Sequence, residues 1–198
     1  AVAVPLYATS SSEQVKYIVD DAHCAMIFVG EQYQYDQTVK VLHQTNVLKK
    51  VITVDPEINL NGIDTSMAFG DFLKYGDGNE QDAELERRHN ELSQDDLATL
   101  IYTSGTSGEP KGVMIMQYNY THQMRIHEKV MPCCDETRTS MMFLPASHIF
   151  ERAWDYLCMY RGAMIYVNKN PKEILTSIKE TRPNMMCAVP RFWEKVYA

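Results

Sequence analysis

Residues 102–112 read Tyr-Thr-Ser-Gly-Thr-Ser-Gly-Glu-Pro-Lys-Gly, and the rest of the chain is interpreted outward from this stretch. Its three glycines permit positive φ angles and a close approach of the backbone to a ligand. Its four hydroxyl side chains and Lys111 supply donors and a positive charge, and backbone N–H groups in such a turn form an anion site. The composition predicts a polyphosphate-binding loop over 103–112; a hydroxyl-rich hairpin without a ligand is the alternative.

The spacing separates this loop from two better-known phosphate loops. A Walker A loop ends in Gly-Lys followed by Ser or Thr, whereas here Pro110 precedes Lys111 and Gly112 follows it. A dinucleotide-binding loop has a different glycine spacing and leads into a helix. Here a strand is predicted at 113–116, so neither type of loop fits.

Apolar periodicity predicts alternating strands and helices on both sides of the loop. After it, strands are predicted at 140–144, 163–167 and 185–189, and a strand at 98–102 leads into it. Helices are predicted near 119–130, over 149–160 with Ser147 as its cap, and from Asn170-Pro171 onward, with Pro183 beyond the end of that helix.

The first 54 residues show the same alternation. Strands are predicted at 2–6, 25–29 and 51–54, and the continuous apolar run at 25–29 is typical of a strand buried on both faces. One helix is predicted from a capping box of Ser10 and Glu13, and a second carries Tyr35, Val39 and Leu42 on one face. Short loops between such elements imply parallel strands, so the fold class is α/β.

Residues 55–97 differ from both flanks. They contain twelve Asp or Glu and three Lys or Arg, a net charge of −9, with short helices predicted around Phe72 and His89. A connector this long predicts a crossing between two incomplete parallel-sheet subdomains, residues 1–54 and 98–198. Its acidic run is interpreted as a solvated face in preference to a docking surface.

Composition narrows the function classes. The 198 residues carry a net charge of −7, which argues against a nucleic-acid partner. Five scattered cysteines do not form a disulfide framework, and no apolar run approaches the roughly 20 residues that cross a bilayer, so a cytoplasmic location is expected. The chain opens on an apolar strand and closes inside a helical pattern, so a segment of a longer protein is expected.

Residues 102–113 resemble the signature loop of the adenylate-forming (AMP-binding) enzymes, with Ser107 in place of the usual threonine. Residues 143–152 (Phe-Leu-Pro-Ala-Ser-His-Ile-Phe-Glu-Arg) and 188–197 (Ala-Val-Pro-Arg-Phe-Trp-Glu-Lys-Val-Tyr) are similar to the long-chain fatty acyl-CoA synthetase branch. Residues 4–10 (Val-Pro-Leu-Tyr-Ala-Thr-Ser) are similar to the same branch. The resemblance covers essentially the whole chain.

The resemblance implies a two-step reaction. A fatty acid carboxylate attacks the α-phosphate of ATP and expels pyrophosphate, and the thiol of CoA then attacks the acyl-adenylate and releases AMP. ATP, Mg²⁺ and CoA are the implied cosubstrates and metal. The residues implied at the nucleotide are Tyr102, Thr103, Ser104, Gly105, Thr106, Ser107, Gly108, Lys111 and Gly112. Lys111 and His148 are the implied catalytic residues, and no residue is assigned to the metal.

Four side chains in 148–154 have competing interpretations. His148 matches a family histidine near the acyl carboxylate and adenylate, and with this match a substrate-side role is preferred to capping or packing at a helix start. Trp154 is interpreted as core rather than as a gate of an acyl tunnel, because some relatives place that tryptophan where Arg152 stands. Glu151 and Arg152 can form a surface ion pair.

The remaining candidates for chemistry are weaker. His122 and His127 are five residues apart, which does not place them on one helix face as zinc ligands, and adjacent Cys133 and Cys134 lack metal-ligand spacing. The twelve methionines fit an adaptable apolar core or an acyl-chain wall.

The resemblance also defines what is missing. The family's Tyr-Gly-x-Thr-Glu motif, ribose-binding aspartate, hinge and C-terminal lysine have no counterpart in the 198 residues, so the isolated segment is expected to be inactive. The leading hypothesis is a piece of an ATP-dependent long-chain fatty acid–CoA ligase, with peripheral membrane association compatible with an acyl substrate. The alternatives are an adenylating enzyme that loads a carrier protein and a non-catalytic nucleotide-binding module.

Overall fold

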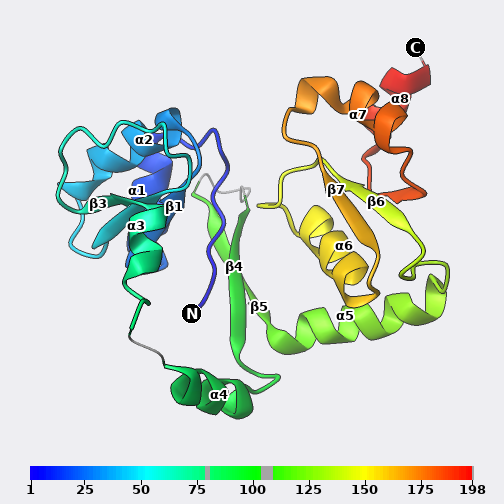
Figure 1. Ribbon diagram of the computed structural model, residues 1–198, viewed down its shortest axis with the longest axis horizontal. Coiled ribbons are helices and arrows are strands. Elements are labelled where there is room, and N and C mark those ends of the chain that lie inside the picture. The colour runs from blue at the N-terminus through cyan, green and yellow to red at the C-terminus, as the bar shows by residue number, and fades with distance from the viewer. Residues whose placement is uncertain (79–80, 104–108, 198) are drawn as a thin grey trace. The chain divides into compact units, whose positions relative to one another are not determined.

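The computed structural model describes residues 1–78, 81–103 and 109–197 (Figure 1). The chain divides into two compact units, one made of residues 1–93 and 102–113 and the other of residues 94–101 and 114–198. The predicted boundaries at residues 54 and 98 stay a prediction. The parallel α/β architecture is confirmed in each unit.

A three-stranded parallel sheet organises the first unit, with strand order β1-β2-β3. Its strands are β1 (Met26–Val29), β2 (Lys50–Thr53) and β3 (Ser66–Ala68), and its helices are α1 (Ser12–Asp21), α2 (Gln32–Leu42), α3 (Phe69–Lys74) and α4 (Asp82–Glu91). β3 lies inside 55–97, where no strand was predicted. The predicted strand at 2–6 is wrong, since only Ala3 there forms an isolated bridge.

The start of α1 differs by one residue from the prediction. Ser11 is the N-cap, and it exchanges hydrogen bonds with Gln14 in a capping box. Ser10 instead is buried, and its backbone N–H donates to the carbonyl of Tyr7 at 3.0 Å. Serine is a preferred N-cap residue, so the sequence alone does not distinguish Ser10 from Ser11. In the structure Ser10 belongs to the turn before the helix, and Ser11 is the cap.

The core of the first unit lies on one face of its sheet. Val15 and Val19 of α1 and Tyr35 and Val41 of α2 pack against Ile27, Val29 and Val51. The other face of β1 is open, because Met26 and Phe28 are 49% and 50% exposed. The prediction of a strand buried on both faces was therefore wrong; Phe28 has ring contacts with Phe69 and Phe72 of α3 instead.

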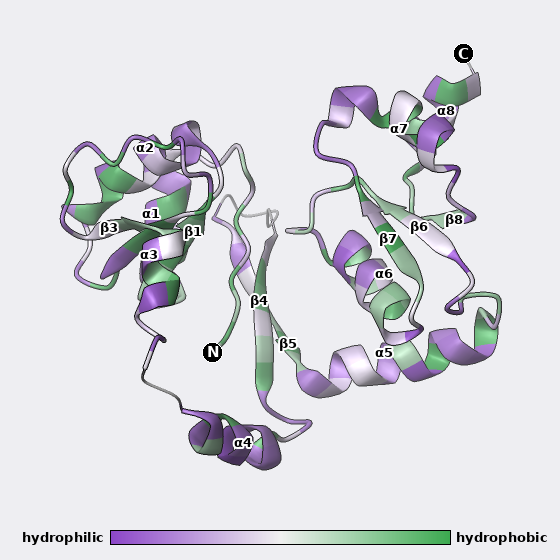
Figure 2. Ribbon diagram, in the orientation of Figure 1, coloured by the Kyte–Doolittle hydropathy of each residue, from purple (hydrophilic) through white to green (hydrophobic). Residues whose placement is uncertain are grey.

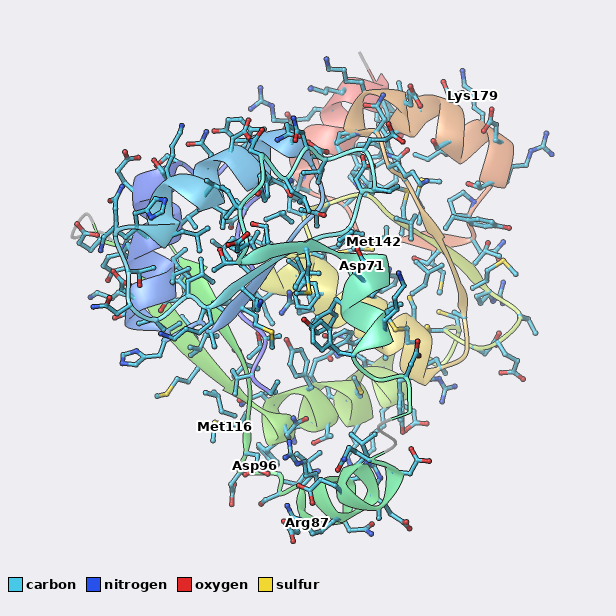
Figure 3. The ribbon with its side chains drawn as sticks, turned by 60° about the vertical axis from the view of Figure 1, so that its left-hand side comes forward. Asp71, Arg87, Asp96, Met116, Met142 and Lys179 are labelled. Atoms are coloured by element: carbon cyan, nitrogen blue, oxygen red, sulfur yellow. The ribbon has the colours of Figure 1, made fainter. Side chains whose placement is uncertain are left out.

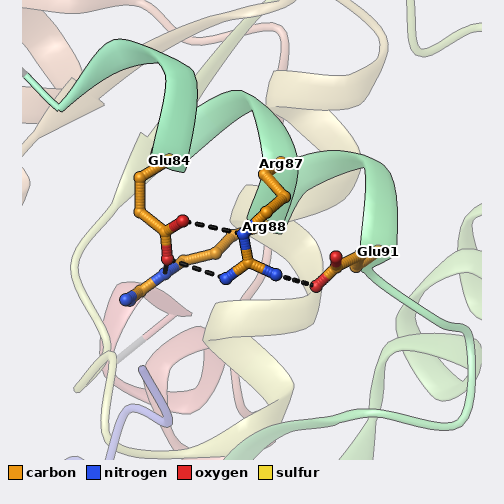
Figure 4. Close-up of polar contacts among 4 residues, drawn as sticks. All are labelled: Glu84, Arg87, Arg88 and Glu91. Carbon is orange, nitrogen blue, oxygen red and sulfur yellow. Dashed lines mark hydrogen bonds and ion pairs between the residues drawn. The ribbon is translucent and has the colours of Figure 1, made fainter.

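Helix α4 is the most polar helix of this unit (Figure 2). All of its residues except Glu84 are exposed. Arg87 pairs with Glu84 and Glu91, and Arg88 pairs with Glu84 (Figure 4). These hydrogen bonds, first from Arg87 and then from Arg88, lower the pKa of Glu84 to about 2. The acidic run thus neutralises part of its charge within one helix.

A second parallel sheet organises the other unit, with strand order β7-β6-β8. Its strands are β6 (Thr139–Met142), β7 (Met164–Val167) and β8 (Met185–Met186). Its helices are α5 (Gln117–Val130), α6 (Ile149–Tyr160), α7 (Ile174–Thr181), preceded by a 3₁₀ turn at Pro171–Glu173, and α8 (Pro190–Tyr197). β8 ends before the predicted limit of 189. The hydrophobic core of this unit contains Cys134, Leu157, Cys158 and Ala163.

The loop of interest connects two paired strands. β4 (Leu97–Thr103) and β5 (Lys111–Met116) form a separate two-stranded sheet. Lys111 begins β5, two residues earlier than the strand predicted at 113–116. Ser104–Gly108 lie outside the described residues.

Within the described part of the chain, none of the helices combines the length and the apolar character that a membrane crossing requires.

Candidate functional site

The structure describes both arms of the predicted phosphate loop. Tyr102 and Thr103 end β4, and Lys111 and Gly112 begin β5. Tyr102 is buried, with 6% of its surface exposed, whereas Thr103 and Lys111 are exposed. The five remaining predicted residues, Ser104, Gly105, Thr106, Ser107 and Gly108, lie outside the described residues.

Helix α1 binds both arms of this loop. The hydroxyl of Tyr102 donates to Oδ2 of Asp21 at 2.5 Å. The hydroxyl of Tyr17 donates to the backbone carbonyl of Pro110 at 3.0 Å. Tyr17 and Asp21 are four residues apart, so they share one face of the helix. One helical face therefore fixes the chain on each side of residues 104–108.

Packing around Tyr102 explains why glycine occupies position 112. A Cβ on Gly112 would lie 3.0 Å from Cζ and 3.2 Å from Oη of Tyr102. The Tyr102 ring also meets the edge of the Tyr17 ring, with a centroid distance of 6.3 Å. Burial, and then the hydrogen bond to Asp21, raise the pKa of Tyr102, so its hydroxyl remains a donor. The two strands approach closely here because residue 112 has no side chain.

A groove of about 770 Å³ lies beside α1 and the outgoing arm of the loop. Its ionisable lining consists of Glu13, Asp20, Asp21 and Glu109 against a single lysine, Lys16. This excess of carboxylates repels a triphosphate. The charged residues described in this groove therefore do not favour the binding of phosphates.

His148 is the N-cap of α6. Its Nδ1 accepts a hydrogen bond from the backbone N–H of Phe150 at 3.2 Å, so Ser147 is not the cap that was predicted. Because Nδ1 is an acceptor, the neutral ring carries its proton on Nε2. Capping of the helix thus uses Nδ1 of His148, and Nε2 can donate a hydrogen bond to another group.

Glu151 and Arg152 do not form the surface ion pair that was predicted. Glu151 is fully buried, and its Oε1 accepts from the backbone N–H groups of Phe143 at 2.9 Å and Leu144 at 3.2 Å. Arg152 donates from Nε to the carbonyl of Ala146 at 2.9 Å. Through these hydrogen bonds, side chains from the first turn of helix α6 fix the backbone of residues 143–146, which leads to His148.

The weaker candidates have structural roles. Trp154 packs against the core of the second unit and donates from Nε1 to Ser140 Oγ at 2.8 Å, as its core interpretation expected. Cys133 is exposed and Cys134 is buried, and both are free thiols. The described residues contain no group of three or more His, Cys, Asp or Glu placed to hold a metal ion.

The sequence did not identify three residues of functional interest. Tyr17 and Asp21 bind the arms of the loop, and Glu151 is buried. The signal for the first two was the placement of polar groups four residues apart on α1, beside the apolar face of that helix. The signal for Glu151 was an acidic residue next to core positions of an amphipathic helix. Lys111 and His148 belong to different compact units.

Relatives by sequence are long-chain acyl-CoA synthetases. Long chain acyl-CoA synthetase 3 of Arabidopsis thaliana is 29% identical over 98% of this chain and 30% of its own length. The long-chain-fatty-acid–CoA ligase FadD15 of Mycobacterium bovis is 29% identical over 100% of this chain and 32% of its own length. The chain therefore spans about a third of the length of these curated relatives.

Solved structures agree on the fold. The anthranilate CoA ligase AuaEII, in complex with anthranoyl-AMP, matches with a TM-score of 0.78 at 16% identity, over 94% of this chain and 35% of that one. The adenylation domain of a carboxylate reductase from Mycobacterium chelonae matches with a TM-score of 0.76 at 22% identity, over 99% and 32%. The AMP-binding enzyme family matches residues 1–198. The chain belongs to the AMP-binding enzyme family.

Proposed function

We propose that the full-length protein is an ATP-dependent long-chain fatty acid–CoA ligase that forms AMP and pyrophosphate. One observation carries the proposal: the glycine- and hydroxyl-rich loop, with both arms bound to α1, lies in a chain that is similar from end to end to long-chain acyl-CoA synthetases. Family membership supports an acyl-adenylate-forming reaction, and the curated relatives favour a long-chain acyl substrate.

The loop over 102–112 is proposed to bind the β- and γ-phosphates. Thr103 and Lys111 are the described donors on its two arms, both exposed. Ser104–Gly108 are proposed to contribute hydroxyl and backbone N–H groups, with Tyr102 and Gly112 keeping the two strands close. Donors fixed in advance stabilise the charge that develops on departing pyrophosphate, which is the main demand of the adenylation step.

His148 is proposed to act on the acyl side. With Nδ1 engaged by the helix N-terminus, Nε2–H is free to donate to the fatty acid carboxylate or to the acyl-adenylate carbonyl. A hydrogen bond from Nε2–H would orient the carboxylate for its attack on the α-phosphate.

Mg²⁺ is proposed to arrive with ATP, where it neutralises phosphate oxygens. Hydroxyls of the loop are hard oxygen donors, and such oxygens are chemically suitable for this cation. CoA is the proposed acyl acceptor, and none of the described residues is assigned to it. Peripheral membrane contact, a cytoplasmic location and the absence of a nucleic-acid partner stay predictions.

The test uses the full-length protein and two lysine variants. Lys111→Ala removes the proposed phosphate cation, whereas Lys179→Ala removes an exposed lysine on α7 (Figure 3). Losing a charge-assisted hydrogen bond in the transition state costs about 1.5–3 kcal/mol, or roughly 10- to 150-fold in rate. We expect that loss in palmitate-dependent ATP–pyrophosphate exchange for Lys111→Ala alone. Unchanged exchange in Lys111→Ala would contradict the phosphate-binding role of this lysine, and no exchange in the wild type would favour a non-catalytic nucleotide-binding module.

A carrier-protein loading enzyme is the second candidate, favoured by the structural match to an adenylation domain. The two candidates share the first step and differ in the thiol that takes the acyl group. The full-length protein is therefore supplied with labelled fatty acid, ATP and either CoA or a phosphopantetheinylated carrier protein. Labelled acyl-CoA without labelled carrier protein supports the ligase. Labelled carrier protein without labelled acyl-CoA supports the loading enzyme.

A further inference from the structure

Helix α6 places two acidic side chains in the interior of its unit. Glu151 is 0% and Asp155 is 3% exposed. Oε1 of Glu151 is occupied by the N–H groups of Phe143 and Leu144. Within the described residues, Oε2 of Glu151 and Oδ1 of Asp155 are buried without a hydrogen-bond partner. Two unsatisfied carboxylate oxygens in a core are costly, so the arrangement requires an explanation.

Among the described residues, neither Glu151 nor Asp155 forms an ion pair with a cation. The neighbouring Arg152 is directed to the carbonyl of Ala146 and the hydroxyl of Thr99. The other titratable groups near the pair are the thiols of Cys158 on α6 and Cys187 after β8. Cys187 shares a hydrogen bond with Glu151, and burial raises the pKa of each thiol to about 12. Both thiols are neutral at ordinary pH, so the two carboxyl groups alone decide the charge of this part of the core.

The charge of Glu151 acts on Asp155, so the two carboxyl groups lie near each other on α6. Glu151 and Asp155 are four residues apart, which places them on one face, one turn from each other. Burial, and then the charge of Glu151, raise the pKa of Asp155 to about 7. A proton on Asp155 turns one orphan acceptor into a donor for the other. Burial raises the pKa of Glu151 as well, while the N–H groups of Phe143 and Leu144 act in the opposite direction and favour its anion.

We propose that Glu151 is a positioning residue for His148, and that Asp155 carries the one proton of the pair and donates it in a hydrogen bond to Oε2 of Glu151. The inference rests on the proposed function only for the role of His148. From the first turn of α6, Glu151 holds Phe143 and Leu144 while Arg152 holds Ala146. These contacts fix the turn from β6 to the cap of α6, and with it the direction of the His148 ring.

The test measures stability and kinetics of the full-length protein against pH, from about pH 5 to pH 9. Asp155→Asn mimics a permanently protonated Asp155, because its amide donates to Glu151 at every pH. Glu151→Gln replaces the carboxyl group by an amide and weakens the hydrogen bonds from the N–H groups of Phe143 and Leu144. Glu180→Gln, at an exposed position of α7, is the matched control.

For stability, the sign follows from the raised pKa of Asp155. As pH rises from about 4 to 7, the unfolded chain releases this proton while the folded chain keeps it, so the wild type loses stability and then levels off. We expect the melting temperature of Asp155→Asn to exceed that of the wild type by a margin that grows up to about pH 7 and then stays constant. A margin that is flat across the range, or a less stable variant, would overturn the shared proton.

For kinetics, Glu151→Gln should lower kcat/KM for the fatty acid by about tenfold with KM for ATP little changed, a split that a general loss of folding does not give. Equal effects on both substrates, or none, would overturn the positioning role. If Glu151→Gln fails to fold, Asp155→Asn decides: we expect kcat/KM of the wild type for the fatty acid to decline above about pH 7, and that of Asp155→Asn not to decline. No difference between the two pH profiles would overturn the positioning role. If no variant or wild type forms acyl-adenylate, the proposed function fails, while the stability series still tests the proton.

Discussion

Gly112 is needed for the two strands to approach each other beside Tyr102. Gly112→Ala would bring Cβ within 3.0 Å of a ring carbon, so either the ring or the strand must move. Overpacking of this kind costs about 1–3 kcal/mol. We expect a lower urea midpoint for the full-length protein and a raised KM for ATP, because the Tyr102–Asp21 hydrogen bond shifts with the ring.

Gly70 is the matched control for this substitution. It lies in α3, and a Cβ there would meet nothing within 4 Å. Gly70→Ala should leave KM for ATP unchanged and raise stability slightly, since alanine favours a helix by up to about 1 kcal/mol over glycine. If both variants behave alike, the close packing against Tyr102 has no role in the loop.

His148 separates capping from chemistry at a single position. Asn keeps an acceptor for the Phe150 N–H and lacks the donor at Nε2, whereas Ala lacks both. We expect His148→Asn to retain wild-type stability but lose at least about tenfold in kcat, and His148→Ala to lose about 1 kcal/mol of stability in addition. Chemical denaturation and steady-state kinetics measure the two effects. Full activity in His148→Asn would leave capping as the whole role of the residue.

Helix α1 connects the fold of the first unit to its loop. Its apolar face packs in the core through Val15 and Val19, while Tyr17 and Asp21 bind the two arms of the loop. The helix is therefore held by hydrophobic burial and is rigid enough to act as an anchor. Asp21 and Tyr17 are separated from their partners by 81 and 93 residues in the chain.

Tyr17→Phe tests this anchor by removing one hydroxyl. The contact to the Pro110 carbonyl is lost, and we expect KM for ATP to rise several-fold with a stability loss near 1 kcal/mol. Tyr35→Phe is the control, because the Tyr35 hydroxyl donates to the Leu60 carbonyl at 2.7 Å within the core region. It should lose similar stability and keep KM for ATP. Equal KM values in both variants would contradict the anchoring role of α1.

Local patterns predicted most elements but not their exact limits or long-range contacts. The helix around Leu157 and the parallel strands of both units follow from apolar periodicity. The cap of α1 moved from Ser10 to Ser11, because neighbouring serines satisfy the same rule. β3 escaped because three residues, Ser66–Ala68, are too short for a periodic signal. The partners of Tyr17 and Asp21 depend on tertiary structure, which no local pattern encodes.

At the scale of the whole molecule, the described residues provide two parallel-sheet units and the arms of one loop. The loop motif was recognisable from its sequence because glycine and hydroxyl spacing is a local property. The burial of Glu151 could not be recognised, since its neighbours come from the segment after β6 and the segment after β8 as well as from α6. Chemistry carried by one stretch is thus predictable, and chemistry assembled from several elements is not.

Residues 1–198 on their own are expected to give no acyl-CoA. They span about a third of the long-chain acyl-CoA synthetases they match, so two thirds of a working enzyme of that kind is not represented. The purified segment is assayed with palmitate, ATP, Mg²⁺ and CoA beside the full-length protein. Acyl-CoA formed by the segment above the level of its Lys111→Ala variant would contradict this expectation.

The position of a bound nucleotide tests the central claim most directly. Crystals of the full-length protein are soaked with a non-hydrolysable ATP analogue and Mg²⁺, and the phosphate density is located. We expect the β- and γ-phosphates against the chain between Thr103 and Gly112, with Lys111 within hydrogen-bonding distance of a phosphate oxygen. Phosphates bound away from this loop, with Lys111 still in solvent, would contradict it.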